Sequence, residues 1–140
     1  MDKDRLIEQL RLHEGVEHKV YKDTEGIETI GVGRNLRDRG LSDDEIDYLL
    51  ANDIAICEQD LDKALPWWRG LDDVRQRVLC DLIFNLGLPR LLGFKKTLEH
   101  IKNEAWYDAS IEMLDSKWAR QVGKRADRLS EMIRTGEDYS

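Results

Sequence analysis

The sequence has little of what would place it in a membrane, in a disulfide-rich class or in a flexible linker. Its 140 residues include two prolines and two cysteines, and no apolar run approaches the roughly 20 residues that span a bilayer. We therefore expect no stable membrane insertion. Cys57 and Cys80 fall within apolar helical patterns, so we interpret them as buried free thiols. The charged, helix-periodic start MDKDRLIEQL does not resemble a cleavable signal peptide, which predicts folding in a cytoplasm.

The net charge and the histidine positions indicate which kinds of partner the chain is expected to bind. A net charge of −7 argues weakly against nucleic acid, and we expect no nucleic-acid partner. Residues 41–62 carry eight acids and no Lys or Arg, whereas residues 117–134 carry six basic side chains. Either cluster is by default a solvated helix face, and the basic one is alternatively a wall facing an anionic polymer. His13, His18 and His100 lack metal-ligand spacing, so no metal is predicted.

Apolar periodicity predicts a short helix, a hairpin and then a long helix. Leu6, Ile7 and Leu10 share one helical face that runs to about Glu14, and Gly15 is a natural stop. Residues 18–33 are β-branched and aromatic around a Thr24-Glu25-Gly26 turn, which is typical of a hairpin. The segment Gly31-Val32-Gly33 is too short for a nucleotide-binding fingerprint and indicates backbone turning.

The rest of the chain is predicted to be helical. Ser42-Asp43-Asp44-Glu45 is a capping-box pattern, and the helix after it keeps one apolar face to Ala64, before Pro66. Further helices are predicted over residues 71–86, 95–102, 106–114 and 124–133. The expected fold class is α+β, mostly helical. We expect one domain over 1–140, with a small lobe at about 14–45 and a helical lobe at about 62–135 that also takes the N-terminal helix 2–13. A cleft between two such lobes suits an extended ligand.

Packing of the first helix end against the hairpin could bring three side chains to one rim. Glu14 lies at the helix end, Asp23 at the hairpin turn and Thr29 on the returning strand. Hydrolysis of a glycosidic bond needs one acid to protonate the leaving oxygen and a second, ionised acid to activate water or stabilise positive charge on the sugar. Taken alone, however, such acids are usually a helix-dipole partner and a turn residue.

The sequence around these three residues favours the catalytic interpretation. The segments HEG at 13–15, YKDTEG at 21–26 and TIGVG at 29–33 closely resemble the phage-type lysozymes (glycoside hydrolase family 24), in particular those of T-even phages. The resemblance continues through WWRGLDDVR at 67–75, FNLG at 84–87 and GFKKTL at 93–98. It ends with Trp118 and the stretch 125–136.

The resemblance implies a lysozyme-like two-lobed fold and a muramidase that cuts the β-1,4 bond between N-acetylmuramic acid and N-acetylglucosamine in peptidoglycan. Glu14 would be the general acid, while Asp23 and Thr29 would handle the water on the opposite face, with inversion at the anomeric carbon. No cofactor is needed for this chemistry. We expect a monomer that lyses the host cell, reaching the wall from the bacterial cytoplasm through a holin-type membrane pore.

The resemblance also implies substrate contacts and shows departures. Phe84 and Thr97 take substrate-contact positions, as does Asn35, where the T-even enzymes have a Leu. Glu112 replaces an Asn at another such position. The small lobe is shorter, with only residues 35–41 between hairpin and capping box.

Arg34 stands where the T-even enzymes have a His. It could still pair with Asp53 of the long helix, so we predict that ion pair.

Two alternatives remain open. A lysozyme-fold module could bind glycan without cutting it, although retention of Glu14, Asp23 and Thr29 together counts against this. A helical regulatory protein would explain the helices but not the hairpin residues. The four tryptophans could stack on sugars, but their helical spacing favours core positions.

Overall fold

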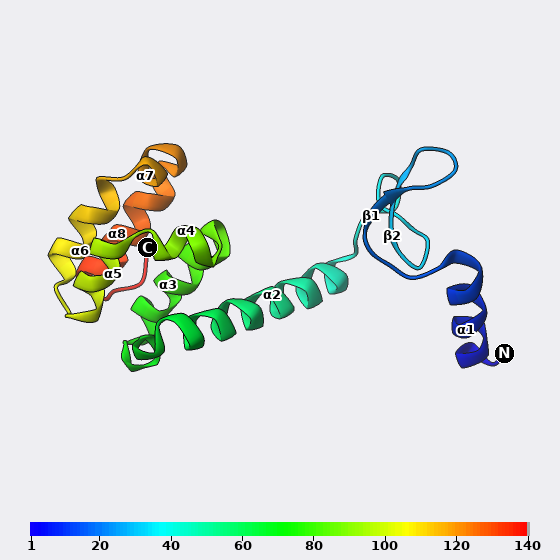
Figure 1. Cartoon of the computed structure of the whole chain (residues 1–140), viewed down its shortest axis with the longest axis horizontal. Helices are drawn as coiled ribbons and strands as arrows, with labels where there is room; N and C mark the ends of the chain where they lie inside the picture. Colours follow the sequence, from blue (N-terminus) through cyan, green and yellow to red (C-terminus); the bar gives the residue numbers. More distant parts are fainter. Residues whose placement is uncertain (140) are drawn as a thin grey trace. The chain divides into compact units, whose positions relative to one another are not determined.

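The computed structural model describes residues 1–139, and the chain divides into two compact units, Met1–Leu49 and Leu50–Ser140. The first, called here the small unit, holds α1 (Lys3–Glu14), β1 (Glu17–Lys22), β2 (Glu28–Gly31), β3 (Arg34–Asn35) and the start of α2 (Asp43–Ala64). The second, the helical unit, holds the rest of α2 and all later elements (Figure 1). A small antiparallel sheet accompanied by many helices confirms the predicted α+β, mostly helical class.

The small unit is built around a three-stranded sheet. Helix α1 begins after Asp2, whose carboxylate accepts the amide of Arg5 at 3.1 Å, and it ends at Gly15, which has φ of 78°. The predicted hairpin is present, because β1 pairs antiparallel with β2 in the register Tyr21 to Thr29. Strand β3, which the sequence did not indicate, extends the sheet by pairing with β2.

The capping box at the start of α2 is confirmed. The amide of Ser42 donates to Oε1 of Glu45 at 2.8 Å, and the amide of Glu45 donates back to Oγ of Ser42 at 3.2 Å. The helix ends at Ala64, as predicted, because Pro66 opens the 3-10 helix η1 (Pro66–Gly70).

The helical unit continues with α3 (Asp73–Leu86), α4 (Leu88–Leu92), α5 (Lys95–Lys102), α6 (Trp106–Leu114), α7 (Lys117–Val122) and α8 (Lys124–Thr135). The bounds of α5 and α6 are those predicted. Helix α3 begins at Asp73 rather than at Leu71, because the Asp72 carboxylate caps it by accepting the amide of Arg75 at 3.2 Å. The short helices α4 and α7 were not predicted.

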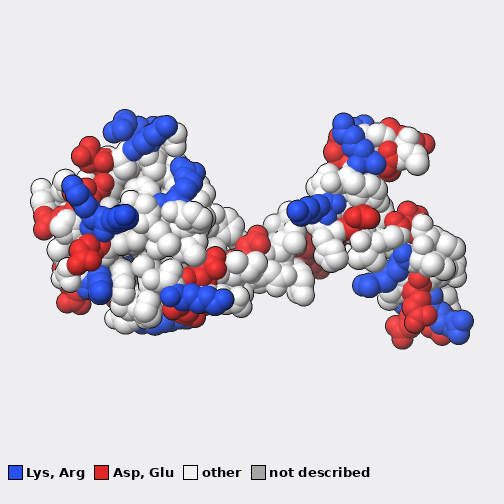
Figure 2. All heavy atoms as spheres, viewed as in Figure 1, with Lys and Arg blue, Asp and Glu red and all other residues white. Residues whose placement is uncertain are grey.

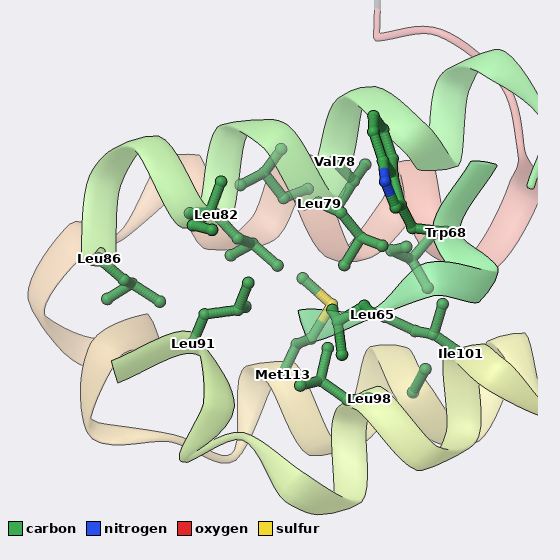
Figure 3. Packing of buried hydrophobic residues seen from close by; sticks show 14 of the residues in the cluster. Leu65, Trp68, Val78, Leu79, Leu82, Leu86, Leu91, Leu98, Ile101 and Met113 are labelled. Carbon is green, nitrogen blue, oxygen red and sulfur yellow. The ribbon is translucent and has the colours of Figure 1, made fainter. Parts of the chain in front are cut away.

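Every buried apolar side chain among the described residues lies in the helical unit. Figure 3 shows Leu82 of α3, Leu91 of α4, Leu98 of α5 and Met113 of α6 directed into the same space. The small unit has no buried apolar residue in the described chain, so backbone pairing and polar contacts carry more of its order.

The four tryptophans and the two cysteines differ in how deeply they are buried. Trp68 and Trp118 are buried, which confirms the core interpretation for these two, whereas Trp67 and Trp106 are half-buried against the core. Cys57 is a buried free thiol and Cys80 a half-buried one. The assignment of residues 2–13 to the helical lobe stays a prediction.

Candidate active site

Glu14 is the last residue of α1, and its carboxyl group lies against the turn between β2 and β3. A Cβ atom placed on Gly33 would lie 2.9 Å from Oε2 of Glu14, closer than real Cβ atoms come to such a neighbour. Gly33 also has φ of 65°, a backbone conformation that favours glycine. Gly31 has φ of 69°, so the predicted backbone turning in this segment is confirmed. The position of Glu14 thus depends on the absence of a side chain at residue 33.

Asp23 follows β1 and organises the hairpin turn. Its Oδ1 accepts the amide of Glu25 at 2.8 Å and the amide of Ile27 at 3.0 Å. The backbone of Asp23 closes the same turn, since its carbonyl accepts the amide of Gly26 at 3.0 Å. No hydrogen bond to Oδ2 is formed within residues 1–139. The turn therefore fixes the carboxylate and leaves one of its oxygens for other partners.

Thr29 lies on β2 and is 3% exposed. Its Oγ1 donates to the carbonyl of Ile27 at 2.8 Å, which uses the hydroxyl proton and leaves the oxygen lone pairs as acceptors. Ile27 also donates its amide to Asp23, so one residue links both side chains through its backbone. No sequence pattern indicates this role of Ile27, because the bonds use its main chain and not its side chain.

The three predicted side chains all belong to the small unit, and their joint role as a catalytic site stays a prediction. Glu14 contacts the turn that follows β2, Thr29 lies on β2 itself, and Asp23 occupies the turn that precedes it. An acid, a second carboxylate with a free oxygen and a hydroxyl acceptor form a set that suits acid-assisted addition of water.

Arg34 pairs with Glu45 within the small unit. The predicted partner Asp53 belongs to the helical unit, and that ion pair stays a prediction. Nη1 of Arg34 donates to Oε1 of Glu45 at 2.8 Å and to the carbonyl of Gly40 at 3.0 Å, while Nη2 donates to Oε2 of Glu45. The capping box holds Glu45 toward Arg34. Hydrogen bonding by Arg34 and then by Ser42 lowers the pKa of Glu45 to about 2.

The predicted substrate-contact residues are divided between the two units. Asn35, in the small unit, is engaged with Asp38, donating to its carboxylate at 3.0 Å and accepting its amide at 2.9 Å. Thr97 and Glu112 line the same hollow of about 730 Å³ in the helical unit, beside the edge-to-face pair of Phe94 and Trp118. Their roles as substrate contacts stay predictions.

Phe84 lies elsewhere in the helical unit, on the exposed surface of α3. It is 48% exposed and lines a different hollow of about 360 Å³, together with Ile83 and Leu88. An exposed aromatic ring beside apolar neighbours can stack on a sugar face. The neighbouring Asn85 is occupied, since its Oδ1 accepts the indole N–H of Trp118 at 2.8 Å.

The basic stretch 117–134 is not a uniform field of positive charge. Arg125 donates to Oδ1 of Asp81 at 2.6 Å, and Arg134 pairs with Glu131. On the face of the helical unit drawn in Figure 2, basic and acidic side chains are interspersed. This arrangement favours the solvated-face interpretation over a basic wall.

Residues 1–139 contain no group of three or more His, Cys, Asp or Glu side chains that could hold a metal ion. Within the same residues no helix is both long enough and apolar enough to cross a membrane.

Comparison with known proteins points to one family. The family model described as phage lysozyme matches residues 11–134. The probable T4-type lysozyme 1 of Dictyostelium discoideum is 25% identical, with 92% of this chain and 93% of that protein aligned. The probable T4-type lysozyme 2 of the same organism is 26% identical, with 94% of each aligned. The pre-baseplate central spike protein Gp5 of Enterobacteria phage T4 is 28% identical, over 94% of this chain but 28% of that protein.

The chain belongs to the phage lysozyme family. It is therefore a glycoside hydrolase, a lysozyme whose substrate is peptidoglycan. The alignments extend over 158 to 160 positions, more than the 140 residues of this chain, so the relatives carry segments that this chain lacks.

Proposed function

We propose that this lysozyme cleaves the β-1,4 bond between N-acetylmuramic acid and N-acetylglucosamine with inversion of the anomeric centre. Glu14 protonates the leaving oxygen, and Asp23 with Thr29 holds the water that attacks the opposite face of the sugar. The observation that carries the proposal is the common frame of the three side chains. Glu14 contacts Gly33 at one end of the β2–β3 segment, and Ile27 joins Asp23 to Thr29 at the other.

The hydrogen bonds in the site favour a role for Asp23 and Thr29 as a pair of acceptors. Oδ1 of Asp23 is occupied by two amides, so Oδ2 is the oxygen offered to water. The hydroxyl proton of Thr29 is directed to the Ile27 carbonyl, so Oγ1 accepts from water rather than donating to it. A water that gives its two protons to these acceptors keeps a lone pair for the sugar. Asp23 then takes the proton that the water loses as the bond forms.

The proposed function also includes contacts with the rest of the glycan strand and a route to the cell wall. Asn35, Phe84 and Thr97 contact the glycan strand. The enzyme acts as a monomer, uses only side chains and water, and lyses the host cell after it crosses the inner membrane through a holin-type pore. Co-expression with and without such a pore tests the last step, since lysis should require both proteins.

The decisive experiment compares wild type with Glu14→Gln on purified peptidoglycan. The amide keeps the size of the side chain but supplies no acidic proton, so we expect the release of reducing ends to fall by at least about 10²-fold. NMR of the first products should show the inverted anomer. Sedimentation with peptidoglycan controls for binding, which Glu14→Gln should retain. Wild type that binds glycan without releasing any product would support a binding module, and Glu14→Gln with full activity would contradict the assignment of the acid.

A further inference from the structure

The small unit contains a second group of side chains, next to the proposed catalytic set, whose geometry serves that set. Strand β3 consists of Arg34 and Asn35 only, and it pairs with the part of β2 that carries Thr29. Asn35 is the register partner of Thr29, and Arg34 is the partner of Ile30. So short a strand gains little from its own ladder, and the small unit has no buried apolar side chain in the described chain to press it into place.

The guanidinium of Arg34 holds β3 in place through polar contacts. It makes a two-pronged contact with the Glu45 carboxylate and also donates to the Gly40 carbonyl at 3.0 Å. Glu45 is itself fixed, because Oε1 accepts the amide of Ser42 at 2.8 Å. The side chains of Arg34 and Glu45 are 21% and 37% exposed, so solvent reaches them only in part. The planar fork therefore joins β3 to the first turn of α2 and closes the loop between them.

The anchored segment touches both halves of the proposed chemistry. Gly33, the residue before Arg34, lies against the carboxyl group of Glu14. Thr29, across the ladder from Asn35, holds the proposed water acceptor. Movement of β3 away from α2 would therefore shift the contact of Glu14 and the support of Thr29 at the same time.

We propose that Arg34 and Glu45 are positioning residues, which hold the β2–β3 segment so that Glu14 and Thr29 keep their places relative to each other. This inference rests on the proposed function, since it assigns the pair a role in the same reaction. Neither side chain needs to touch the glycan. The pair acts through the backbone of residues 29–35.

The test compares Arg34→Gln and Arg34→Lys with wild type and with the matched control Arg77→Gln. Arg77 is also a bridged arginine, pairing with Asp73 and with Asp138 at 2.9 Å each, but it lies in the helical unit. A displacement of about 1 Å in an active site can cost roughly 10²-fold in rate. We expect Arg34→Gln to lower kcat about tenfold with little change in KM. Arg34→Lys should recover part of the loss, because it keeps the charge but not the fork.

An NMR readout keeps the test independent of activity. The backbone amide signals of Thr29 and Gly33 should shift or broaden in Arg34→Gln and in Glu45→Gln, but not in Arg77→Gln. Equal falls in kcat for Arg34→Gln and Arg77→Gln would show a general effect of stability and overturn the proposal. So would unchanged signals at Thr29 and Gly33.

The two proposals fail in distinguishable ways. If wild type releases no product, the proposed reaction falls and the positioning role falls with it. If wild type is active while Arg34→Gln keeps full kcat, only the positioning role is wrong.

Discussion

The two oxygens of Asp23 have separable tasks, and a pair of substitutions divides them. Asp23→Asn keeps an acceptor at the position of Oδ1 and removes the charge. Asp23→Ala removes both. Because Oδ1 accepts two backbone amides at 2.8 and 3.0 Å, only the alanine variant should disturb the hairpin turn. Both variants should lose the second carboxylate that the proposed reaction needs.

The magnitudes follow from the contacts. A hydrogen bond to a charged group contributes about 1.5–3 kcal/mol, and water partly replaces these two in a half-buried turn, so Asp23→Ala should cost about 2 kcal/mol in total. In a chain of this size that corresponds to a fall in Tm of roughly 8 °C. Asp23→Asn should cost less than about 1 kcal/mol, since a neutral amide oxygen still accepts both bonds. Peptidoglycan hydrolysis should fall at least about 10²-fold in both variants.

Three measurements on the same preparations check this reasoning. Circular dichroism gives Tm, reducing-end release gives activity, and hydrogen exchange reports the amides of Glu25 and Ile27. Exchange at these two amides should accelerate in Asp23→Ala and remain slow in Asp23→Asn. Full activity in Asp23→Asn would refute the need for a charge at residue 23. Equal destabilisation by both substitutions would refute the assignment of Oδ1 as the acceptor that holds the turn.

Three further predictions concern other residues. Thr29→Ser should keep most of the activity and Thr29→Val should lose it with little change in Tm, as measured by reducing-end release; an active Thr29→Val would remove the hydroxyl from the mechanism. The pKa of Glu45 is lowered from 4.5 to about 2, so the stabilisation by its ion pair is complete above pH 4.5 and is lost as the pH falls toward 2. Tm should therefore fall more between pH 5 and pH 2.5 in wild type than in Glu45→Gln, and parallel curves would contradict the pair's contribution. Leu79 is fully buried, so Leu79→Ala should cost about 3 kcal/mol in denaturant unfolding while activity at 25 °C persists; a cost below about 1 kcal/mol would contradict its place in the core.

Local signals in the sequence predicted the elements that short-range chemistry controls. The capping box placed the start of α2, Gly15 placed the end of α1, and the apolar periodicity gave the bounds of α5 and α6. The missed elements are short. Helix α7 has six residues and a Ser116 cap but too few positions to show a period, and β3 has two residues.

In the candidate site, too, some features could be predicted from the sequence and others could not. Glu14, Asp23 and Thr29 could be selected from the sequence because motif residues surround them. The partner of Arg34 could not, because it depends on how the loop from residue 36 to 42 folds back, and that path brings in Glu45 of the capping box. The contact of Glu14 with Gly33 was also hidden, since glycine offers no side chain from which to predict it.

The two thiols of the helical unit bear on how the enzyme withstands a change of surroundings. Burial is the main cause that raises the pKa of Cys57, and it raises that of Cys80 to about 11. The thiolate is the form that reacts with oxidants and disulfides, and with a pKa near 11 only about one Cys80 side chain in ten thousand is ionised at pH 7. Burial therefore lowers the reactivity of both thiols toward oxidants and disulfides at neutral pH, so the core of the helical unit is protected from covalent rearrangement.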